Sequence, residues 1–383
     1  DIAKINEILK SLKDKGNTVL IVEHDPDVIK EGDYIIDMGP GSGKNGGEIT
    51  FEGTYNELLS SNTSTGNALR NKHNLKENIR ESNHFYNIGP VTQNNLNNVK
   101  TSIPKHVLTV LTGVAGSGKS TLVKAGFENN DHTIFIDQKA VQGSNRSNLL
   151  TYLGVFDSVR SFFSKETGLN KAMFSYNSKG ACPNCGGKGY IKTELAFMGD
   201  FSQTCEVCHG KRYKQEVLDA TIDGYSIADV LDLTVDEGII FFDKKNDIKS
   251  KLQSVSKTGL NYMSLGQPLS TLSGGEIQRV KLAQHLDEEI KNSIFIFDEP
   301  TTGLHESDIP ILMERFDDLI DQNNTVILIE HNLSIMCEAD WIIDVGPGPG
   351  LDGGKVQFSG TPKNFIDSSE TLTSKHLKRY INQ

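Results

Sequence analysis

The feature that most constrains the fold is an internal repeat that runs without a gap at an offset of 307 residues. The stretch TVLIVEHD at residues 18–25 returns as TVILIEHN at residues 325–332. The segment DYIIDMGPGSGKNGGEITFEGT at 33–54 likewise returns as DWIIDVGPGPGLDGGKVQFSGT at 340–361. A chain that carries one piece twice is expected to build the same local structure twice.

Each copy begins with a helical pattern and continues into an apolar run. In the first copy the apolar residues Ile2, Ile5, Ile8, Leu9 and Leu12 form one helix face, and GNTVLIVEH then predicts a turn and a buried strand. In the second copy the helix face comprises Ile309, Leu312, Phe316 and Leu319, and TVILIEH is the strand. Helices followed by apolar strands favour a parallel α/β sheet. The glycine-rich segments after both strands are expected to be short hairpins.

Composition narrows the class of protein. A chain of 383 residues predicts two or three domains at roughly 100–200 residues each. No stretch approaches the roughly 18 apolar residues of a membrane span, and no signal peptide is visible, so we expect a cytoplasmic protein with no membrane partner. The first residue is Asp rather than Met, from which we expect a fragment. The net charge of −11 argues against a surface coated in basic residues but leaves room for a local basic patch.

A phosphate-binding loop is predicted at GVAGSGKST, residues 113–121, which fits G-x4-G-K-[ST] between an apolar strand and a helix. Glycines let backbone N–H groups face phosphates, Lys119 reaches the β/γ oxygens, and the Ser120 hydroxyl suits Mg²⁺. The alternative is an ordinary glycine-rich turn. The candidate nucleotide-binding residues are Gly113, Gly116, Ser117, Gly118, Lys119, Ser120 and Thr121.

A second match, GPGSGKNG at residues 39–46, fails this pattern. Met38 and Asn45 occupy the two positions that would need Gly and Ser or Thr, and its repeat GPGPGLDG carries no lysine. We therefore predict a structural turn there.

The stretch LSGGEIQRVKLAQHL predicts a helix whose start is capped by Ser273 and Glu276. One interpretation is a well-capped helix and nothing more. The other is that the free N–H groups at Ser273, Gly274 and Gly275 bind a γ-phosphate.

Two acids end the predicted strand in IFIFDEPTTGLH, residues 294–305. Asp298 suits Mg²⁺, and Glu299 suits the activation of an attacking water, although such a pair can also merely cap the next helix. His331 ends the neighbouring strand, where it can bond a γ-phosphate. Gln138 ends the apolar run TIFID, where it can sense Mg²⁺ and water.

Two CxxC pairs, CPNC and CEVC, lie 19 residues apart and predict a structural four-cysteine zinc site at Cys182, Cys185, Cys205 and Cys208. A redox role for the pairs is the alternative. Residues 179–214 also hold six basic and three acidic residues, together with Tyr190, Phe197, Phe201 and Tyr213. This patch is either a DNA-backbone contact or a solvated rim. Its candidate DNA-binding residues are Lys188, Lys192, Lys211, Arg212 and Lys214.

These motifs, in this order, resemble an ATP-binding cassette (ABC) ATPase. More narrowly, LTGVAGSGKSTL, CPNCGGKGYI, CEVCHGKRY, LGQPLSTLSGGEIQRVKLA, FDEPTTGLH and ADWIIDVGPGPG resemble the UvrA family, the damage-recognition subunit of the bacterial excinuclease. The resemblance implies an α/β P-loop NTPase cassette with an inserted signature and zinc lobe. It also implies ATP, Mg²⁺ and Zn²⁺ as cofactors, and two cassettes whose phosphate loops each pair with the other's signature.

Under this resemblance His24 corresponds to the switch histidine of the first cassette. The implied function is an ATP-hydrolysing, DNA-binding subunit of nucleotide excision repair without a nuclease centre. Its implied partners are damaged double-stranded DNA, a nuclease-loading partner of the UvrB type and a second copy of the full-length protein. A UvrA-like protein in drug resistance stays open as an alternative, as do a non-hydrolysing switch and the nucleotide-binding subunit of an exporter. The aromatic that stacks on adenine stays unassigned.

The predicted organisation has five parts. They are the tail of the first cassette (1–59), a mobile polar linker (60–86), the ATP-binding core of the second cassette (87–144), the inserted signature lobe with its zinc module (145–271) and the closing part with the signature helix and acidic strand (272–383).

Overall fold

The computed structural model describes residues 2–41, 43–71, 74–139, 147–195, 199–286 and 290–382. It divides into two compact units. Unit 1 comprises Asp1–Gln138 and Glu289–Gln383, and unit 2 comprises Lys139–Glu288. The predicted boundary between residues 144 and 145 lies outside the described residues.

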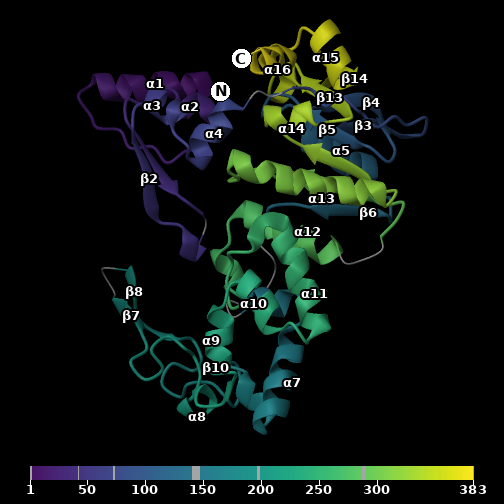
Figure 1. The fold of residues 1–383 in the computed structure, drawn as a ribbon. Helices are drawn as coiled ribbons and strands as arrows, with labels where there is room; N and C mark the ends of the chain where they lie inside the picture. The colour runs from purple at the N-terminus through teal and green to yellow at the C-terminus, as the bar shows by residue number, and fades with distance from the viewer. Residues whose placement is uncertain are drawn as a thin grey trace. The chain divides into compact units, whose positions relative to one another are not determined.

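Unit 1 is built on a six-stranded sheet in the order β14-β13-β5-β12-β11-β6 (Figure 1). The pairs β6–β11, β11–β12, β12–β5 and β5–β13 are parallel, and β14 pairs antiparallel with β13 at one edge. The prediction of a parallel α/β sheet is therefore confirmed. The strands are β5 (Leu108–Thr112), β6 (Thr133–Ile136), β11 (Ile294–Asp298), β12 (Thr325–Ile329), β13 (Trp341–Gly346) and β14 (Lys355–Gly360).

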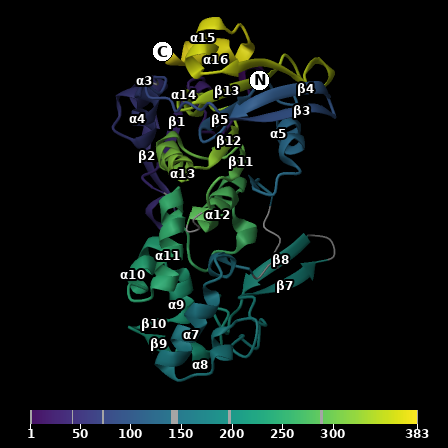
Figure 2. The ribbon, with the colours of Figure 1, turned by 90° about the vertical axis from the view of Figure 1, so that its right-hand side faces the viewer.

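Layers cover both faces of this sheet, as Figure 2 shows. Helix α13 (Ile309–Asp321) lies on one face, where the rings of Phe297 and Phe316 are 4.8 Å apart. Helix α5 (Lys119–Phe127) and the hairpin β3–β4 (Phe85–Gln93 and Leu96–Pro104) cover the other, where they share a core with Ile296 and Ile327. Alternate strand residues thus fill opposite cores, as a pleated strand buried on both faces requires.

The repeat is visible in the hairpins. β1 (Ile35–Gly39) pairs antiparallel with β2 (Glu48–Gly53), as β13 does with β14, and both pairs carry a register shift at equivalent positions, after Asp37 and after Asp344. Each hairpin leads into a short helix, α3 (Tyr55–Ser60) or α15 (Pro362–Ser368), behind an equivalent threonine cap. The predicted hairpins are confirmed, and a short 3-10 helix at Gly43–Asn45 lies between β1 and β2.

The two copies differ at the predicted strand. Helix α1 (Ile2–Asp14) and short helix α2 (Pro26–Ile29) are present, but residues 17–25 between them form no strand. Leu20 and Val22 are 88% and 95% exposed. Their equivalents Ile327 and Ile329 lie in β12, buried between β5 and β11. The prediction of a buried strand in the first copy is wrong because, among the described residues, no strand lies beside 17–25 to share its backbone hydrogen bonds.

The segment predicted as a mobile polar linker, residues 60–86, has more order than its composition suggested. It contains α4 (Ser64–Arg70), capped by Thr63. Beyond α4, Lys76 and Arg80 both form ion pairs with the buried carboxylate of Asp340, and the Lys76 N–H donates to the carbonyl of Cys337 at 2.8 Å. Basic side chains that meet a buried acid hold an otherwise polar segment on the second copy.

Two short helices, α14 (Leu333–Cys337) and α16 (Leu372–Ile381), complete unit 1. The fifth cysteine, Cys337, is buried in α14 as a free thiol, as expected of an inert core cysteine.

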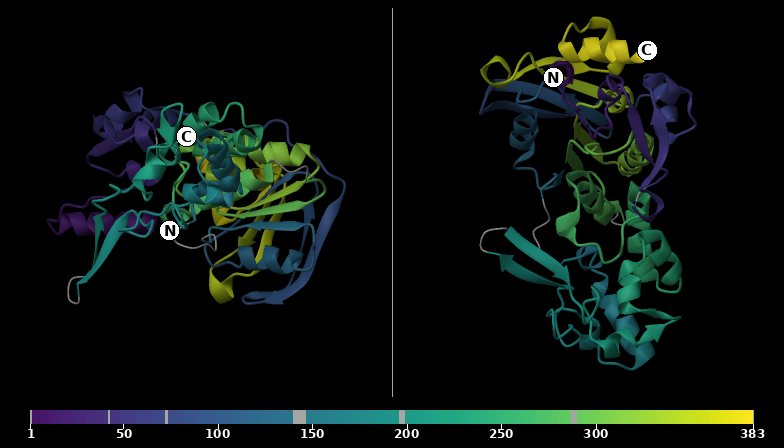
Figure 3. Two further views of the ribbon diagram at one scale, coloured as in Figure 1. Left: turned by 90° about the horizontal axis from the view of Figure 1, so that it is seen from below. Right: turned by 90° about the vertical axis from the view of Figure 1, so that its left-hand side faces the viewer.

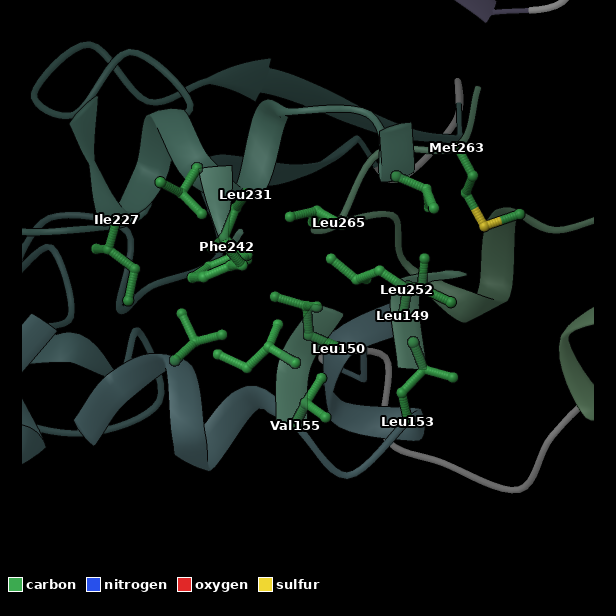
Figure 4. Packing of buried hydrophobic residues seen from close by; sticks show 14 of the residues in the cluster. Leu149, Leu150, Leu153, Val155, Ile227, Leu231, Phe242, Leu252, Met263 and Leu265 are labelled. Atoms are coloured by element: carbon green, nitrogen blue, oxygen red, sulfur yellow. The ribbon is translucent and has the colours of Figure 1, made fainter. Parts of the chain in front are cut away.

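Unit 2 is mainly helical around its own apolar core, part of which Figure 4 shows. Phe242, Leu252 and Leu265 lie at its centre. The signature helix α12 contributes Val280 and Ala283, so it belongs to unit 2 and not to the closing part that the sequence predicted. Its elements are α6 (Leu149–Tyr152), α7 (Phe156–Thr167), α8 (Gln215–Leu218), α9 (Ile227–Asp232), α10 (Val235–Phe241), α11 (Asn246–Val255) and α12 (Gly274–Leu286), with strands β7 (Tyr190–Leu195), β8 (Gly199–Thr204), β9 (Thr221–Ile222) and β10 (Tyr225–Ser226).

The hairpin β7–β8 projects from the helices of unit 2 (Figure 3). In the ranges that the structure describes, no helix is long and apolar enough to cross a membrane.

Candidate functional site

The predicted phosphate loop connects β5 to α5. Gly118 has a φ of +102° and immediately precedes α5. A Cβ at Gly113 would lie 1.9 Å from the carbonyl oxygen of Val345, and its φ is +130°. Both positions therefore demand glycine. The loop is also held by the turn after β13, because Gly350 N–H donates to the Gly116 carbonyl at 3.0 Å.

The loop borders a cavity of about 350 Å³. Its lining joins the phosphate loop to the ends of β11 and β12, far apart in sequence. The lining residues are Asn94, Asn95, Ala115, Gly116, Gly118, Lys119, Ser120, Thr121, Glu299, Ile329 and His331.

Lys119 and Ser120 begin α5 at the floor of this cavity. The Lys119 ammonium is buried and donates to the carbonyls of Gly113 and Val114, both at 3.0 Å. The Ser120 hydroxyl donates to Asp298 Oδ1 at 3.3 Å. A hydroxyl beside a carboxylate offers the oxygen ligands that Mg²⁺ prefers.

The acidic pair stands at the carboxyl end of β11. The Glu299 carboxylate lies 3.6 Å from His331 Nε2, and Gln138 donates through Nε2 to the Glu299 carbonyl at 3.1 Å. The structure thus brings Lys119, Ser120, Asp298, Glu299, His331 and Gln138 to one end of the sheet.

The pKa values of Glu299 and His331 are shifted in opposite directions. Burial raises the pKa of Glu299, and the negative charge of Asp298 adds to that rise. Burial lowers the pKa of His331 to about 4, helped by the positive charge of Lys119. At neutral pH His331 is therefore neutral, and its contact with Glu299 is not an ion pair. Burial also lowers the pKa of Lys119.

Sequence reasoning missed three residues of this region. Asn94 and Asn95 come from the turn between β3 and β4; Asn94 donates to the Thr121 hydroxyl at 3.2 Å and Asn95 to the Gly350 carbonyl at 3.1 Å. Glu330 is buried and accepts from the N–H of Thr301 at 2.9 Å. The signal for Glu330 was present in the repeat, because both copies read EH before the loop.

The signature residues Ser273, Gly274 and Gly275 lie in unit 2. Ser273 and Glu276 form the predicted capping box: the N–H of Ser273 donates to Glu276 Oε2 at 2.7 Å, and the N–H of Glu276 donates to Ser273 Oγ at 3.3 Å. Tyr262 donates to Glu276 Oε1 at 2.7 Å and fixes this carboxylate further.

The four cysteines of the CxxC pairs form one buried cluster in unit 2, in which the sulfurs lie within 4.8 Å of one another. The Sγ atoms of Cys182 and Cys205 are 4.0 Å apart, and those of Cys185 and Cys208 are 3.6 Å apart. Four thiolates around a tetrahedral zinc at about 2.3 Å would be separated by about 3.8 Å, so the cluster fits this metal.

Backbone and side-chain N–H groups donate to the sulfurs, which also supports a metal site at the cluster. Gly189 N–H donates to Cys185 Sγ at 3.2 Å, and Asn184 donates to Cys205 Sγ at 3.3 Å. The Asn184 bond is the main reason that the pKa of Cys205 falls to about 6. The four sulfurs meet at one point, which favours a metal site over the alternative of two separate redox pairs.

The basic patch beside this cluster is more varied than its composition implied. Lys188 and Lys192 are exposed, whereas Lys211 pairs with Asp229 at 2.8 Å and the Arg212 guanidinium lies over the Tyr176 ring. Lys214 is half-buried. Of the aromatic residues in the patch, Tyr190 is exposed, while Tyr213 is a core residue 5.7 Å from Tyr176 and cannot stack on a base. Phe197 lies outside the described residues, as does the side chain of Phe201.

Comparisons with known proteins agree with this geometry. The family model described as ABC transporter matches residues 96–302. The UvrABC system protein A of Clostridium perfringens is 42% identical over 416 residues, which cover the whole of this chain and 44% of that protein. The protein of the same name from Aquifex aeolicus is 42% identical and is covered to 45%.

Among solved structures, the crystal structure of UvrA2 from Deinococcus radiodurans superposes with a TM-score of 0.92 at 38% identity, covering all of this chain and 50% of that one. The chain thus spans about half the length of the relatives that it matches.

Proposed function

The chain belongs to the ATP-binding cassette family, and UvrA proteins are among its relatives. On this basis we propose that it binds and hydrolyses ATP to control DNA binding in nucleotide excision repair. One observation carries the proposal. Lys119, Ser120, Asp298, Glu299 and His331 come from three separate stretches of sequence and meet around one cavity.

Each side chain has a role that its position supports. Lys119 binds the β/γ-phosphate oxygens, and Ser120 and Asp298 would hold Mg²⁺, which would neutralise charge on the phosphates. Glu299 accepts a proton from the attacking water, which its raised pKa favours. Neutral His331 donates a hydrogen bond to the γ-phosphate, and Gln138 keeps the backbone of Glu299 in place.

The signature of this chain completes a different site. Its free N–H groups at Ser273, Gly274 and Gly275 would bind the γ-phosphate held by the phosphate loop of another cassette. The full-length protein then carries two composite sites, acts as a homodimer in the cytoplasm and hands damaged DNA to a UvrB-type, nuclease-loading partner. The names of the relatives, which place them in a UvrABC system, support the partner of the UvrB type.

Nucleotide binding tests the assignment of the loop. We expect Lys119→Ala to lose most MgATP affinity in equilibrium titration, because the triphosphate loses its buried cation. Lys105→Ala is the matched control, since Lys105 lies over the ring of Tyr86 rather than in the cavity. Equal MgATP affinity of Lys119→Ala and the unaltered chain would refute the assignment.

DNA binding is proposed for Lys188, Lys192, Lys211, Arg212 and Lys214. The support is the local excess of positive charge in a chain of net charge −11. Each phosphate contact contributes about 0.9 to the slope of log affinity against log salt. We expect Lys188→Ala with Lys192→Ala to reduce that slope by about two, measured by fluorescence anisotropy on duplex DNA. A slope equal to that of the unaltered protein would identify this patch as a solvated rim.

A further inference from the structure

The loop that follows the acidic pair is held at its far end by the first copy of the repeat. Thr65, in the first turn of α4, donates through Oγ to Asp37 Oδ1 at 2.7 Å, and the same oxygen lies 3.1 Å from His305 Nε2. The N–H of Ser307 donates to His305 Nδ1 at 3.2 Å. The Ser307 Oγ also lies 2.8 Å from Nδ1, which leaves Nε2 as the ring nitrogen that contacts Thr65. Thr65 thus contacts the first hairpin through Asp37 and the loop after the acidic pair through His305.

Among the described residues, the second copy contains the same Asp–Thr pair without a histidine contact. Thr373 donates to Asp344 Oδ1 at 3.3 Å, and Thr373 lies two residues after the helix cap Thr371, as Thr65 lies two residues after Thr63. An Asp–Thr bond between hairpin and helix is therefore a structural part of the repeat. The contact with His305 is what the first copy adds to it.

At its near end, at Thr301, the loop is bound through Glu330 to His331. Thr301 donates to Glu330 Oε1 from its N–H at 2.9 Å and from its hydroxyl at 2.6 Å. The N–H of His331 donates to Glu330 Oε2 at 2.9 Å. Glu330 is 3% exposed, so these neutral donors reach a carboxylate shielded from water.

The backbone is strained at Glu299, two residues before the near anchor at Thr301. Glu299 has a φ of +55°, which a residue with a Cβ rarely adopts. Two turns follow it, from the Thr302 N–H to the Glu299 carbonyl at 3.2 Å and from the Leu304 N–H to the Thr301 carbonyl at 2.9 Å. A strained conformation persists only where surrounding contacts determine it. The Glu299 N–H donates to the Ile329 carbonyl at 2.9 Å and its carbonyl accepts from Gln138, while the two anchors hold the turns that follow.

We propose that Thr65 is a positioning residue for Glu299. Through His305 it holds the loop 299–305, so that hydrolysis at the phosphate loop 113–121 depends on the hairpin β1–β2 and on helix α4. The inference rests on the proposed ATPase function. It assigns a use to Asp37, Thr65 and His305, which the nucleotide site itself leaves without one.

Steady-state ATP hydrolysis by the full-length protein tests this coupling. In Thr65→Val, which keeps the shape but removes the hydroxyl, we expect kcat to fall by about three- to tenfold, the effect of one positioned hydrogen bond. The KM for ATP should stay close to that of the unaltered protein, because Thr65 does not line the cavity. Thr65→Ser restores the hydroxyl and should restore kcat.

Ser64→Ala is the matched control, because it removes an exposed hydroxyl from the same turn of α4. If Thr65→Val turns over at the rate of the unaltered protein, the coupling is refuted. It is equally refuted if Thr65→Val lowers the ATP affinity along with kcat, since the whole nucleotide site would then be disturbed rather than the position of Glu299. A lack of turnover in the unaltered protein would instead refute the ATPase function itself, and the coupling with it.

Discussion

Glu299 is the residue on which the proposed hydrolysis depends most directly. Its φ is positive, and its carboxylate lies beside His331. Burial, together with the charges of Asp298 and Glu330, raises its pKa. A carboxylate with a raised pKa is a stronger proton acceptor for water than an ordinary one. The same feature makes the rate sensitive to pH in a defined direction.

The pH profile of hydrolysis should show this direction. Glu299 must be deprotonated to accept a proton, so kcat/KM falls as the pH drops through its raised pKa. We expect the acid limb to lie above the ordinary glutamate value of 4.5. Phosphate release at saturating Mg²⁺ measures the profile. The limb should vanish from the residual turnover of Glu299→Gln, and a limb that persists there would assign it to another group.

The residue scale also shows what sequence reasoning can supply. Lys119, Asp298, Glu299 and His331 are predicted from their motifs. The structure places Lys119, Glu299 and His331 around one cavity, and Asp298 beside Ser120 of the same cavity. Asn94 and Asn95 could not be found in this way, because they reach the cavity through a turn between β3 and β4 that carries no motif. Their place depends on how a hairpin packs against the loop, which is a tertiary property.

At the scale of elements, the two copies of one sequence take different structures. Helix α1 and hairpin β1–β2 form in the first copy as predicted, since their signals are local. The strand expected at residues 17–25 does not form, since β12 owes its structure to β5 and β11 on either side. Periodicity predicts which segments are apolar, but not whether neighbours exist to bury them.

Matched substitutions in the repeat measure this difference. Ile327→Ala opens a hole in the sheet core and should destabilise unit 1 by about 2–5 kcal/mol. Leu20→Ala, at the equivalent exposed position, should change the free energy of unfolding by less than about 0.5 kcal/mol. Denaturant unfolding of this chain compares the two. Equal losses would show that residues 17–25 are buried after all.

The cysteine cluster gives a second test at this scale. Cys205→Ser removes one of four ligands and should abolish bound zinc, whose contribution in small peptides is about 10–16 kcal/mol. Metal analysis should fall from one zinc per chain to none, and the region around β7 and β8 should become sensitive to protease. MgATP affinity should be unchanged, since the phosphate loop lies in unit 1. Cys337→Ser is the control, because Cys337 lies outside the cluster. Full zinc content in Cys205→Ser would contradict the site.

At the scale of the whole molecule, the chain separates into two units with different parts of the chemistry. Unit 1 carries the phosphate loop and the acids; unit 2 carries the signature and the cysteines. The sequence predicted an inserted lobe but ended it before the signature helix. The reason lies in packing, since Val280 and Ala283 of α12 complete the core of unit 2, and a helical period does not reveal which core its apolar face will join.

The central claim is that one Mg²⁺–triphosphate site in unit 1 uses Glu299 to activate water. Phosphate release by Glu299→Gln in the full-length protein tests it most directly, with the exposed acid Glu314→Gln as control. The account predicts a loss of about 10²–10⁴-fold in turnover with MgATP binding retained, and no change in the control. Turnover by Glu299→Gln at the rate of the unaltered protein would contradict it.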